Sequence, residues 1–216
     1  MNSPDDIRIE RTSLLTPLRM LLTFTVVISA YDTGQAVLSF IELAKQPGMD
    51  TMLVLIWLLS APMSFICAVC LFLSIKKLRE GKSASMTLTV GIGAMVLSSV
   101  AALISQANVL NGKALSILVL CGIVLVCYVI VFLYYQKIGA KPLTIFAAVM
   151  GVLCGGYYLL NGIVLVKDQP EQILGYLFSS YLTAFLVAIC VLIYTLTVGI
   201  GPVIEEVEED DRDFVD

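Results

Sequence analysis

The sequence predicts an all-α integral membrane protein with six transmembrane helices in one compact bundle and both termini in the cytoplasm. Three observations lead to this fold class. Of the 216 residues, 59% are apolar and 14% are charged, whereas soluble domains are nearer half apolar and a quarter charged. Six apolar runs are each long enough to cross a bilayer. Basic residues gather in the segments that would lie on one side of it.

The six predicted spans are, in chain order, residues 17–43, 51–75, 84–106, 114–135, 142–166 and 173–199. A helix needs about 20 apolar residues to cross the hydrocarbon core, and every run reaches that length. The alternation typical of a β-barrel is absent, and lipid leaves a spanning backbone no structure other than helix or barrel. Turn-forming residues separate the runs, among them Pro47-Gly48, Gly81, Asn111-Gly112, Gly139 and Pro170.

Three local features refine these spans. Thr16-Pro17 is typical of a helix start, with a capping hydroxyl followed by proline in the first turn. Pro62 removes one backbone hydrogen bond inside the second span, which predicts a kink and a candidate gate. Small residues at spacing four predict close-packed helix faces in the last two spans. They are Ala147, Gly151 and Gly155, and Ser180, Ala184 and Ala188.

Basic residues determine the predicted orientation. With the N-terminus inside, the inner segments hold Arg8, Arg11, Arg19, Lys76, Lys77, Arg79, Lys82, Lys137, Lys141 and Arg212. The outer segments hold only Lys45, Lys113 and Lys167. An excess of this kind marks the cytoplasmic side.

Two segments lie outside the predicted membrane domain of residues 17–199. Residues 1–16 form a cytoplasmic N-terminal segment; a cleaved signal peptide is the rival interpretation, but the apolar run continues too far for one. Residues 200–216 form an acidic tail in which eight acidic residues face only Arg212. We expect this tail to be disordered and either to bind a basic protein partner or merely to solvate the chain.

Asp32 is the most informative residue because it lies close to the middle of the first span. A carboxylate at that depth costs about 2.5–3.5 kcal/mol on insertion scales and normally faces the bundle interior or water. Helical geometry places Thr25, Ser29 and Gln35 near the same face, and an opposite face is apolar. Asp32 is therefore either a proton or cation site, or a protonated group that hydrogen-bonds a neighbouring helix.

Tyr158 and Asn161 on the fifth span are candidate partners of Asp32. They lie on, or at the edge of, the face predicted to pack closely through Ala147, Gly151 and Gly155. If the first and fifth helices touch, an amide and a phenol would approach the carboxylate. The candidate solute- or ion-binding set is thus Asp32, Ser29, Gln35, Tyr158 and Asn161.

Composition and spacing exclude several other chemistries. The chain has no histidine, which excludes His-ligated haem and Ser-His-Asp triads. Cys67-Ala68-Val69-Cys70 lies inside an apolar span, where a thiol is inert. Asp32-Thr33-Gly34 lacks the second carboxylate that aspartic proteases need. We therefore expect no catalytic residue, no metal site, no cofactor and no nucleic-acid partner.

Two functions remain prominent. The first is a transporter- or channel-like protein that binds or moves a small solute, cation or proton along the polar stripe of the first helix. The second is a non-catalytic membrane subunit that docks other proteins through its bundle and tail; a lipid-handling enzyme ranks last. The size and number of spans resemble those of small bacterial permeases and substrate-binding membrane subunits, although no motif carries this resemblance. It implies a multi-pass protein of a bacterial cytoplasmic membrane, with bilayer lipid and a homo- or hetero-oligomer as expected partners.

Overall fold

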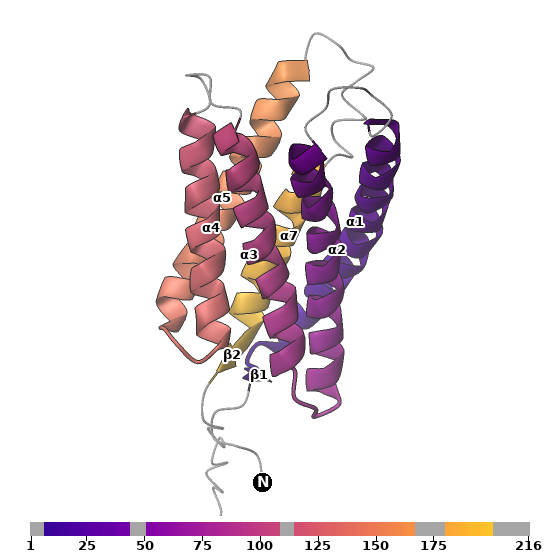
Figure 1. Ribbon diagram of the computed structural model, residues 1–216. Helices are drawn as coiled ribbons and strands as arrows, with labels where there is room; N and C mark the ends of the chain where they lie inside the picture. The colour runs from indigo at the N-terminus through magenta and orange to yellow at the C-terminus, as the bar shows by residue number, and fades with distance from the viewer. Residues whose placement is uncertain (1–6, 44–50, 109–114, 167–179, 201–216) are drawn as a thin grey trace, which may run out of the picture.

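The computed structural model describes residues 7–43, 51–108, 115–166 and 180–200, and these residues are mostly helical. The helices are α1 (Leu15–Leu43), α2 (Thr51–Arg79), α3 (Ser85–Asn108), α4 (Leu115–Tyr135), α5 (Lys141–Val166) and α7 (Ser180–Thr197) (Figure 1). Two short strands, β1 (Ile7–Ile9) and β2 (Val198–Ile200), and the 3-10 turn η1 (Thr12–Leu14) complete the described structure. The predicted helical class is therefore confirmed.

Four of the described helices are long and apolar enough to cross a membrane. The qualifying stretches are Thr12–Glu42, Ser85–Ile104, Ile117–Tyr135 and Lys141–Leu160. Large apolar side chains cover their outer surfaces; Phe146, Leu153 and Leu160 of α5, for example, are all about 60–65% exposed. A soluble protein rarely exposes a contiguous apolar surface of this extent. These helices indicate a membrane protein.

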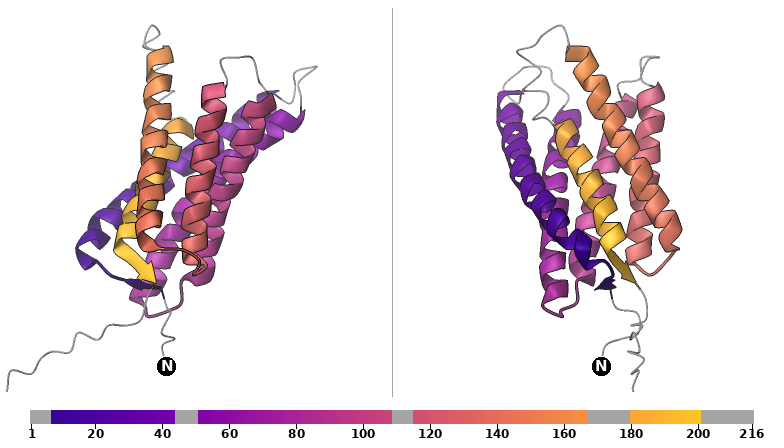
Figure 2. Two further views of the ribbon diagram at one scale, coloured as in Figure 1. Left: turned by 90° about the vertical axis from the view of Figure 1, so that its left-hand side faces the viewer. Right: turned by 180° about the vertical axis from the view of Figure 1, so that it is seen from behind.

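The helices form a ring in which each packs against its neighbour in the chain (Figure 2). The last helix, α7, closes the ring because it packs against both α5 and α1, and it also contacts α2 across the bundle. Seen from behind, α7 lies between α1 and α5. This arrangement makes α2 and α7, rather than α5, the principal neighbours of α1.

The best-packed core lies in the half of the bundle nearer β1 and β2. Leu71, Ile75, Leu88, Val187 and Tyr194 are almost fully buried there. Glycine allows the closest helix approach in this region: a side chain at Gly91 of α3 would lie only 2.7 Å from the Cβ of Cys70 on α2. Small residues at such a crossing let two membrane helices gain van der Waals contact.

Helices α2 and α4 end with the same hydrogen-bonding pattern. After α2, Gly81 has a positive φ of 69°, and the amide of Lys82 donates to the carbonyl of Lys77 at 2.8 Å. After α4, Lys137 has a φ of 67°, and the amide of Ile138 donates to the carbonyl of Leu133 at 2.9 Å. A left-handed residue followed by this long backward bond caps the last carbonyls of a helix.

The predicted span of residues 173–199 is wrong at its C-terminal end. Helix α7 ends at Thr197, and Val198–Ile200 pairs antiparallel with Ile7–Ile9. Two β-branched residues around a glycine favour an extended backbone, and β1 supplies the partner that sequence reasoning did not foresee. The N-terminal segment thus contains a strand, and the tail predicted from residue 200 begins one residue later at the earliest. Residues 167–179 and 201–216, including the rest of the predicted tail, lie outside the described residues.

Other helix boundaries differ by a few residues. Helix α1 starts at Leu15 instead of residue 17, and α2 continues to Arg79 instead of stopping at residue 75. Lys76, Lys77 and Arg79 extend α2 because lysine and arginine are good helix formers and interact favourably with the negative end of the helix dipole. Hydropathy marks where the apolar run ends, which is not where the helix ends.

Candidate functional site

One face of α1 is turned toward the bundle interior and carries the predicted polar stripe. Leu18, Leu22, Thr25, Ser29, Asp32 and Ala36 are buried and follow each other at helical spacings of three and four. The opposite face is apolar and exposed, as predicted, through Phe24, Val27, Leu38 and Ile41. Thr25 and Ser29 are fully buried, and Asp32 is only 5% exposed. A carboxyl group therefore lies inside the bundle, near the middle of α1.

Helix α7 covers this stripe, and one contact determines how the two helices are aligned. The hydroxyl of Thr25 lies 3.3 Å from the sulfur of Cys190. The helices run in opposite directions, so seven residues forward on α1 correspond to seven residues back on α7. That step is about 10 Å along each axis and two turns of helix, which returns to the same face. From this step we infer that Thr183 lies at about the level of Asp32, although Thr183 Oγ1 forms no hydrogen bond to it.

We call the five residues Thr25, Ser29, Asp32, Thr183 and Cys190 the α1–α7 seam. All five are buried. The α1 hydroxyls donate to carbonyls of their own helix: Thr25 to Leu21 at 2.8 Å and Ser29 to Val26 at 3.1 Å. Such a hydroxyl keeps lone pairs with which it can accept a further hydrogen bond. The seam is therefore a line of oxygen and sulfur atoms within an apolar bundle.

Thr183 differs from the other hydroxyls of the seam. Its side chain is fully buried, and its Oγ1 has no hydrogen-bond partner among the described residues. Burying an unsatisfied hydroxyl usually costs about 1–3 kcal/mol. Native structures keep such a group where it serves something other than packing, for example a bound ion or water.

The remaining predicted site residues lie elsewhere. Gln35 is exposed, because at about 60° from Asp32 it lies at the edge of the stripe, where neither neighbouring helix covers it. Tyr158 is half-buried, and its hydroxyl bonds to Cys121 at 2.8 Å and donates to the carbonyl of Ile117 at 3.2 Å, both on α4. Asn161 belongs to α5, but its side chain lies outside the described part of the chain.

The predicted approach of Tyr158 to Asp32 is not among the contacts found. Both hydrogen bonds of the phenol go to α4, and its ring packs against Tyr181 of α7 with centroids 6.4 Å apart. The reason is the ring order, in which α5 packs on α4 and α7 while α1 packs on α2 and α7. Pro62, the predicted kink, lies inside α2, and the helix continues through it.

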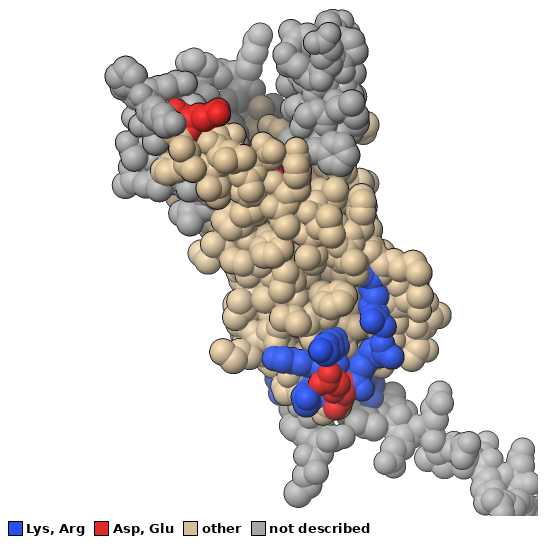
Figure 3. All heavy atoms as spheres, turned by 90° about the vertical axis from the view of Figure 1, so that its right-hand side faces the viewer, with Lys and Arg blue, Asp and Glu red and all other residues tan. Residues whose placement is uncertain are grey.

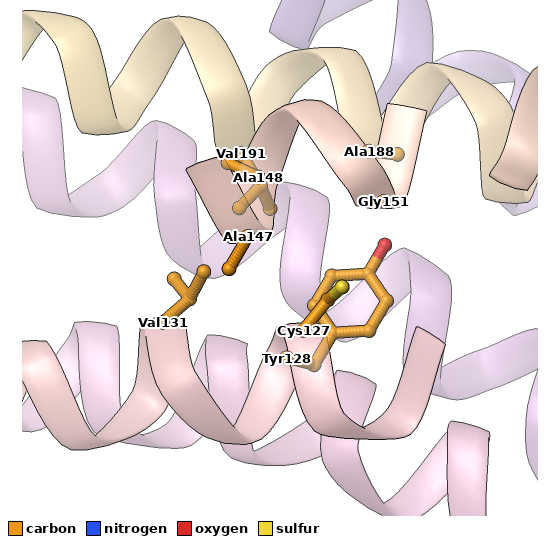
Figure 4. Close-up of a pocket in the computed structure, with 8 residues that line it drawn as sticks. All are labelled: Cys127, Tyr128, Val131, Ala147, Ala148, Gly151, Ala188 and Val191. Carbon is orange, nitrogen blue, oxygen red and sulfur yellow. The ribbon is translucent and has the colours of Figure 1, made fainter. Parts of the chain in front are cut away.

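A small void lies between α4, α5 and α7, away from Asp32 (Figure 4). Its volume is about 10 Å³, close to that of one water molecule, and its lining is almost entirely apolar. Gly151 contributes to it, because the space beside this glycine is open. An apolar void of this size stays dry, so it is a packing defect and not a ligand pocket.

The cysteines form no disulfide among the described residues. All six are free thiols, and Cys67 of the C-x-x-C pair is fully buried. Among the described residues, no three Cys, Asp or Glu side chains are grouped so that they could hold a metal ion.

The end of the bundle that carries β1 and β2 is strongly charged. Every lysine and arginine of the described residues lies there, below a broad uncharged band (Figure 3). Glu10 forms an ion pair with Lys141, and its carboxylate lies over Gly199, which has no side chain to obstruct it. Three buried tyrosines lie next to the strands. The hydroxyl of Tyr134 accepts a hydrogen bond from the amide of Ile200 at 3.2 Å. The ring of Tyr134 packs beside that of Tyr135, which packs on the ring of Tyr194. We call this region the basic end.

Sequence reasoning missed the α7 half of the seam. It assigned the packing face of this helix to Ser180, Ala184 and Ala188; Ala188 is buried, Ala184 is exposed, and the side chain of Ser180 lies outside the described residues. The buried face instead contains Thr183, Cys190 and Tyr194. Their spacings of seven and four residues place these polar groups on one face, a signal that was available but weaker than the small-residue stripe.

No protein-family model, curated protein or solved structure matches this chain.

Proposed function

We propose that this chain is a transporter- or channel-like membrane protein that binds a proton or small cation at Asp32. The observation that carries the proposal is the position of this carboxyl, which is 5% exposed and lies near the middle of α1 on the face that α7 covers. Such groups inside a membrane are rare and commonly mark ion pathways or proton relays. The seam gives Asp32 polar neighbours, whereas lipid would give it none.

The charge distribution supports an electrogenic role over a structural ion pair. Among the described residues, the basic side chain nearest to Asp32 along α1 is Arg19, thirteen residues away, or ~20 Å at 1.5 Å per residue. An ion pair with an arginine or lysine of α1 is therefore excluded, and in this proposal a proton or a bound cation neutralises the carboxylate. In both cases the carboxylate becomes negatively charged when the proton or cation leaves, and an ion-binding site needs such reversible release.

We also propose six spans with both termini in the cytoplasm of a bacterial cell. The pairing of β1 with β2 supports a common side for the two ends of the chain. The collection of lysines and arginines at that end supports the cytoplasmic side. The acidic tail does not oppose this orientation, because acidic residues contribute little to the rule.

Cysteine labelling tests this orientation. In intact cells, a variant whose only cysteine replaces Gly112 should react with an impermeant maleimide, and a variant whose only cysteine replaces Gly81 should not. Both should react after the membrane is permeabilised, which verifies that the thiols are accessible. The reverse pattern in intact cells would show that the basic end faces outward.

The proposed ion site is tested in liposomes, with protons and Na⁺ as the probes. Asp32→Asn keeps the size and hydrogen bonding of the side chain but cannot become negatively charged. We expect it to abolish proton or Na⁺ flux while the melting temperature stays close to that of the wild type. Glu42→Gln is the matched control, because Glu42 is exposed near the far end of the same helix. Full flux from Asp32→Asn with an unshifted pH profile, or no flux from the wild type, would refute the proposal.

A non-catalytic membrane subunit is the second candidate. The observation in its favour is that β2, at the basic end, is followed in the sequence by the acidic residues 205–216. Truncation after Val203 tests it. Loss of a co-purifying protein, with ion flux and melting temperature unchanged, would favour the subunit function over the transporter.

A further inference from the structure

We propose that the ligand of the α1–α7 seam is a proton, and that it exchanges with the basic end through buried hydroxyl and thiol groups. This inference rests on the proposed function, because it names the ion that Asp32 binds and the route it takes. The groups of the route are Ser29, Thr25, Cys190, Tyr194 and Ser74. We call them the polar path.

The choice of a proton follows from the oxygen atoms at the level of Asp32. A metal cation in a protein needs enough oxygen ligands to replace its hydration shell. Among the described side chains of the α1–α7 seam, this level offers the carboxyl of Asp32, the hydroxyl of Thr183 and, one turn away, the hydroxyl of Ser29. The backbone carbonyls of both helices are used by the helices themselves. Such a set is too small for Na⁺ or K⁺, whereas a proton needs a single carboxylate oxygen.

The polar path begins on α1 and crosses to α7. Ser29 and Thr25 follow Asp32 toward the basic end at intervals of three and four residues, and both are fully buried. Thr25 then meets Cys190 of α7 at 3.3 Å. Residues at these intervals are neighbours on one helix face, about 5–6 Å apart between Cβ atoms. One water molecule or a rotating hydroxyl bridges a gap of that length.

The path ends at the hydroxyls of Tyr194 and Ser74, beside the tyrosines of the basic end. Tyr194 lies one turn beyond Cys190, and its hydroxyl accepts a hydrogen bond from Ser74 of α2 at 2.9 Å. Its ring packs against Tyr135, with centroids 5.9 Å apart. The hydroxyl of Tyr135 donates to the carbonyl of Val198 in β2, at the basic end. Buried polar groups thus follow one another from the seam to the end of the bundle.

The proposed transfer conserves charge at every step. The Asp32 carboxylic acid gives its O–H proton to the first acceptor of the path and becomes a carboxylate. Each hydroxyl or thiol along the path accepts one proton and releases its own, so it returns to its neutral form. The proton leaves into water at the basic end. The only lasting change is one negative charge on Asp32, which is removed when a proton returns.

Other ionisable groups on the helices that contact α1 must be distinguished from Asp32. Among the described side chains, α2 contributes Cys67 and Cys70 and the basic residues of its last turn, Lys76, Lys77 and Arg79. Helix α7 contributes Tyr181, Cys190 and Tyr194, and α1 itself contributes Tyr31, Arg19 and Glu42. Of these side chains, only Glu42 shares with Asp32 the infrared C=O stretch of a carboxylic acid. The other carboxyl groups of the chain, 17 Asp and Glu in all, give the same band, so the Asp32 contribution is the part that Asp32→Asn removes.

The experiment follows this band by infrared difference spectroscopy after a pH jump on the full chain in vesicles. Vesicles captured through a tag placed after Asp216 present the basic end to the outer solution. The Asp32 band is identified because Asp32→Asn removes it, Asp32→Glu moves it and Glu42→Gln leaves it in place. We expect Thr25→Val and Tyr194→Phe to slow deprotonation roughly tenfold, a rate change that corresponds to ~1.4 kcal/mol in the barrier. The titration midpoint should not move.

Thr144→Val is the matched control for Thr25→Val. Both threonines are buried and donate to the carbonyl four residues earlier in their own helix, but Thr144 lies on α5, away from the polar path. We expect the control to react at the wild-type rate, and replacement of choline by Na⁺ to leave the midpoint unchanged.

The remaining outcomes separate the two proposals. A titration midpoint that shifts with Na⁺ would contradict the proposal that the ligand is a proton. The proposal that Asp32 is an ion site would remain. Wild-type rates in both path variants, or a tenfold effect of the control as well, would overturn the polar path. A band that does not titrate, or that persists in Asp32→Asn, would refute the proposed function together with this inference.

Discussion

The basic end and the α1–α7 seam both bury polar side chains, but they use them differently. At the basic end, polar groups bond from one element to another. Ser74 of α2 bonds to Tyr194 of α7, Lys77 of α2 donates to Thr87 of α3 at 2.7 Å, and Gln136 after α4 donates to Thr89 of α3 at 2.6 Å. In the seam, the hydroxyls of Thr25 and Ser29 donate within their own helix, and Thr25 also contacts the sulfur of Cys190 on α7 at 3.3 Å.

This difference distinguishes polar groups that stabilise the bundle from polar groups that remain available to a ligand. A hydrogen bond between two helices fixes their relative position, and its loss leaves a buried partner unsatisfied. A hydroxyl that bonds within its own helix contributes little to bundle assembly and retains lone pairs toward the interior. We therefore expect substitutions at the basic end to reduce stability, and substitutions in the seam to change either the binding of the proton at Asp32 or the rate of its transfer, with little effect on stability.

Ser74→Ala should have the largest effect on stability. It leaves the fully buried hydroxyl of Tyr194 without its partner Ser74, a loss of about 1–3 kcal/mol. Unfolding by a denaturing detergent, compared with the wild type, measures it. Ser99→Ala is the control, because this buried serine donates only to the carbonyl of Met95 in its own helix. Equal losses of stability in the two variants would mean that the hydrogen bond between α2 and α7 contributes no more than one within a single helix.

Thr183→Val should change stability in the opposite direction. Valine has nearly the same shape and removes a buried hydroxyl without a partner among the described residues, so stability should stay unchanged or rise by about 1 kcal/mol. In the same samples, the protonation of Asp32 should change. A loss of stability without any change at Asp32 would assign Thr183 to packing and would remove it from the seam.

Lys141→Ala should have a smaller effect. The ion pair with Glu10 is partly exposed, with 29% and 28% of the two side chains accessible. Pairs of this kind contribute about 0.2–1 kcal/mol, and salt weakens them. The melting temperature should fall slightly at low salt and match that of the wild type at high salt. A large fall at both salt concentrations would show that Lys141 anchors β1 in some further way.

Glu80→Gln should have the smallest effect. Glu80 lies in the exposed turn after α2, where a hydrogen bond from Lys82 at 2.7 Å holds the pKa of its carboxyl below its usual value. A lowered pKa stabilises the fold above the unfolded value, and this contribution is lost as pH falls through the folded pKa. Melting curves of variant and wild type should coincide under acid conditions and differ only marginally at neutral pH. A clear difference that grows as the pH falls would contradict this assignment.

The hydropathy pattern predicted the helices better than their ends. Long apolar runs leave a helix no alternative in lipid, so the spans at residues 51–75, 84–106, 114–135 and 142–166 all correspond to described helices. The C-terminal ends of α2 and α7 were missed because other forces decide them. Lysine and arginine extend α2, while strand pairing with a segment almost 190 residues earlier ends α7.

For the candidate site, the sequence alone determined that a carboxyl group lies near the middle of the first helix and that one face of this helix is polar. Both follow from local periodicity, since successive residues of a helix are related by a fixed rotation. Only the tertiary structure decided which helix covers that face. The alignment of Thr183 with Asp32, and the separation of Tyr158 from it, depend on α7 closing the ring between α5 and α1. Helix neighbours are selected by packing over the whole bundle, and no pattern within a single span encodes that choice.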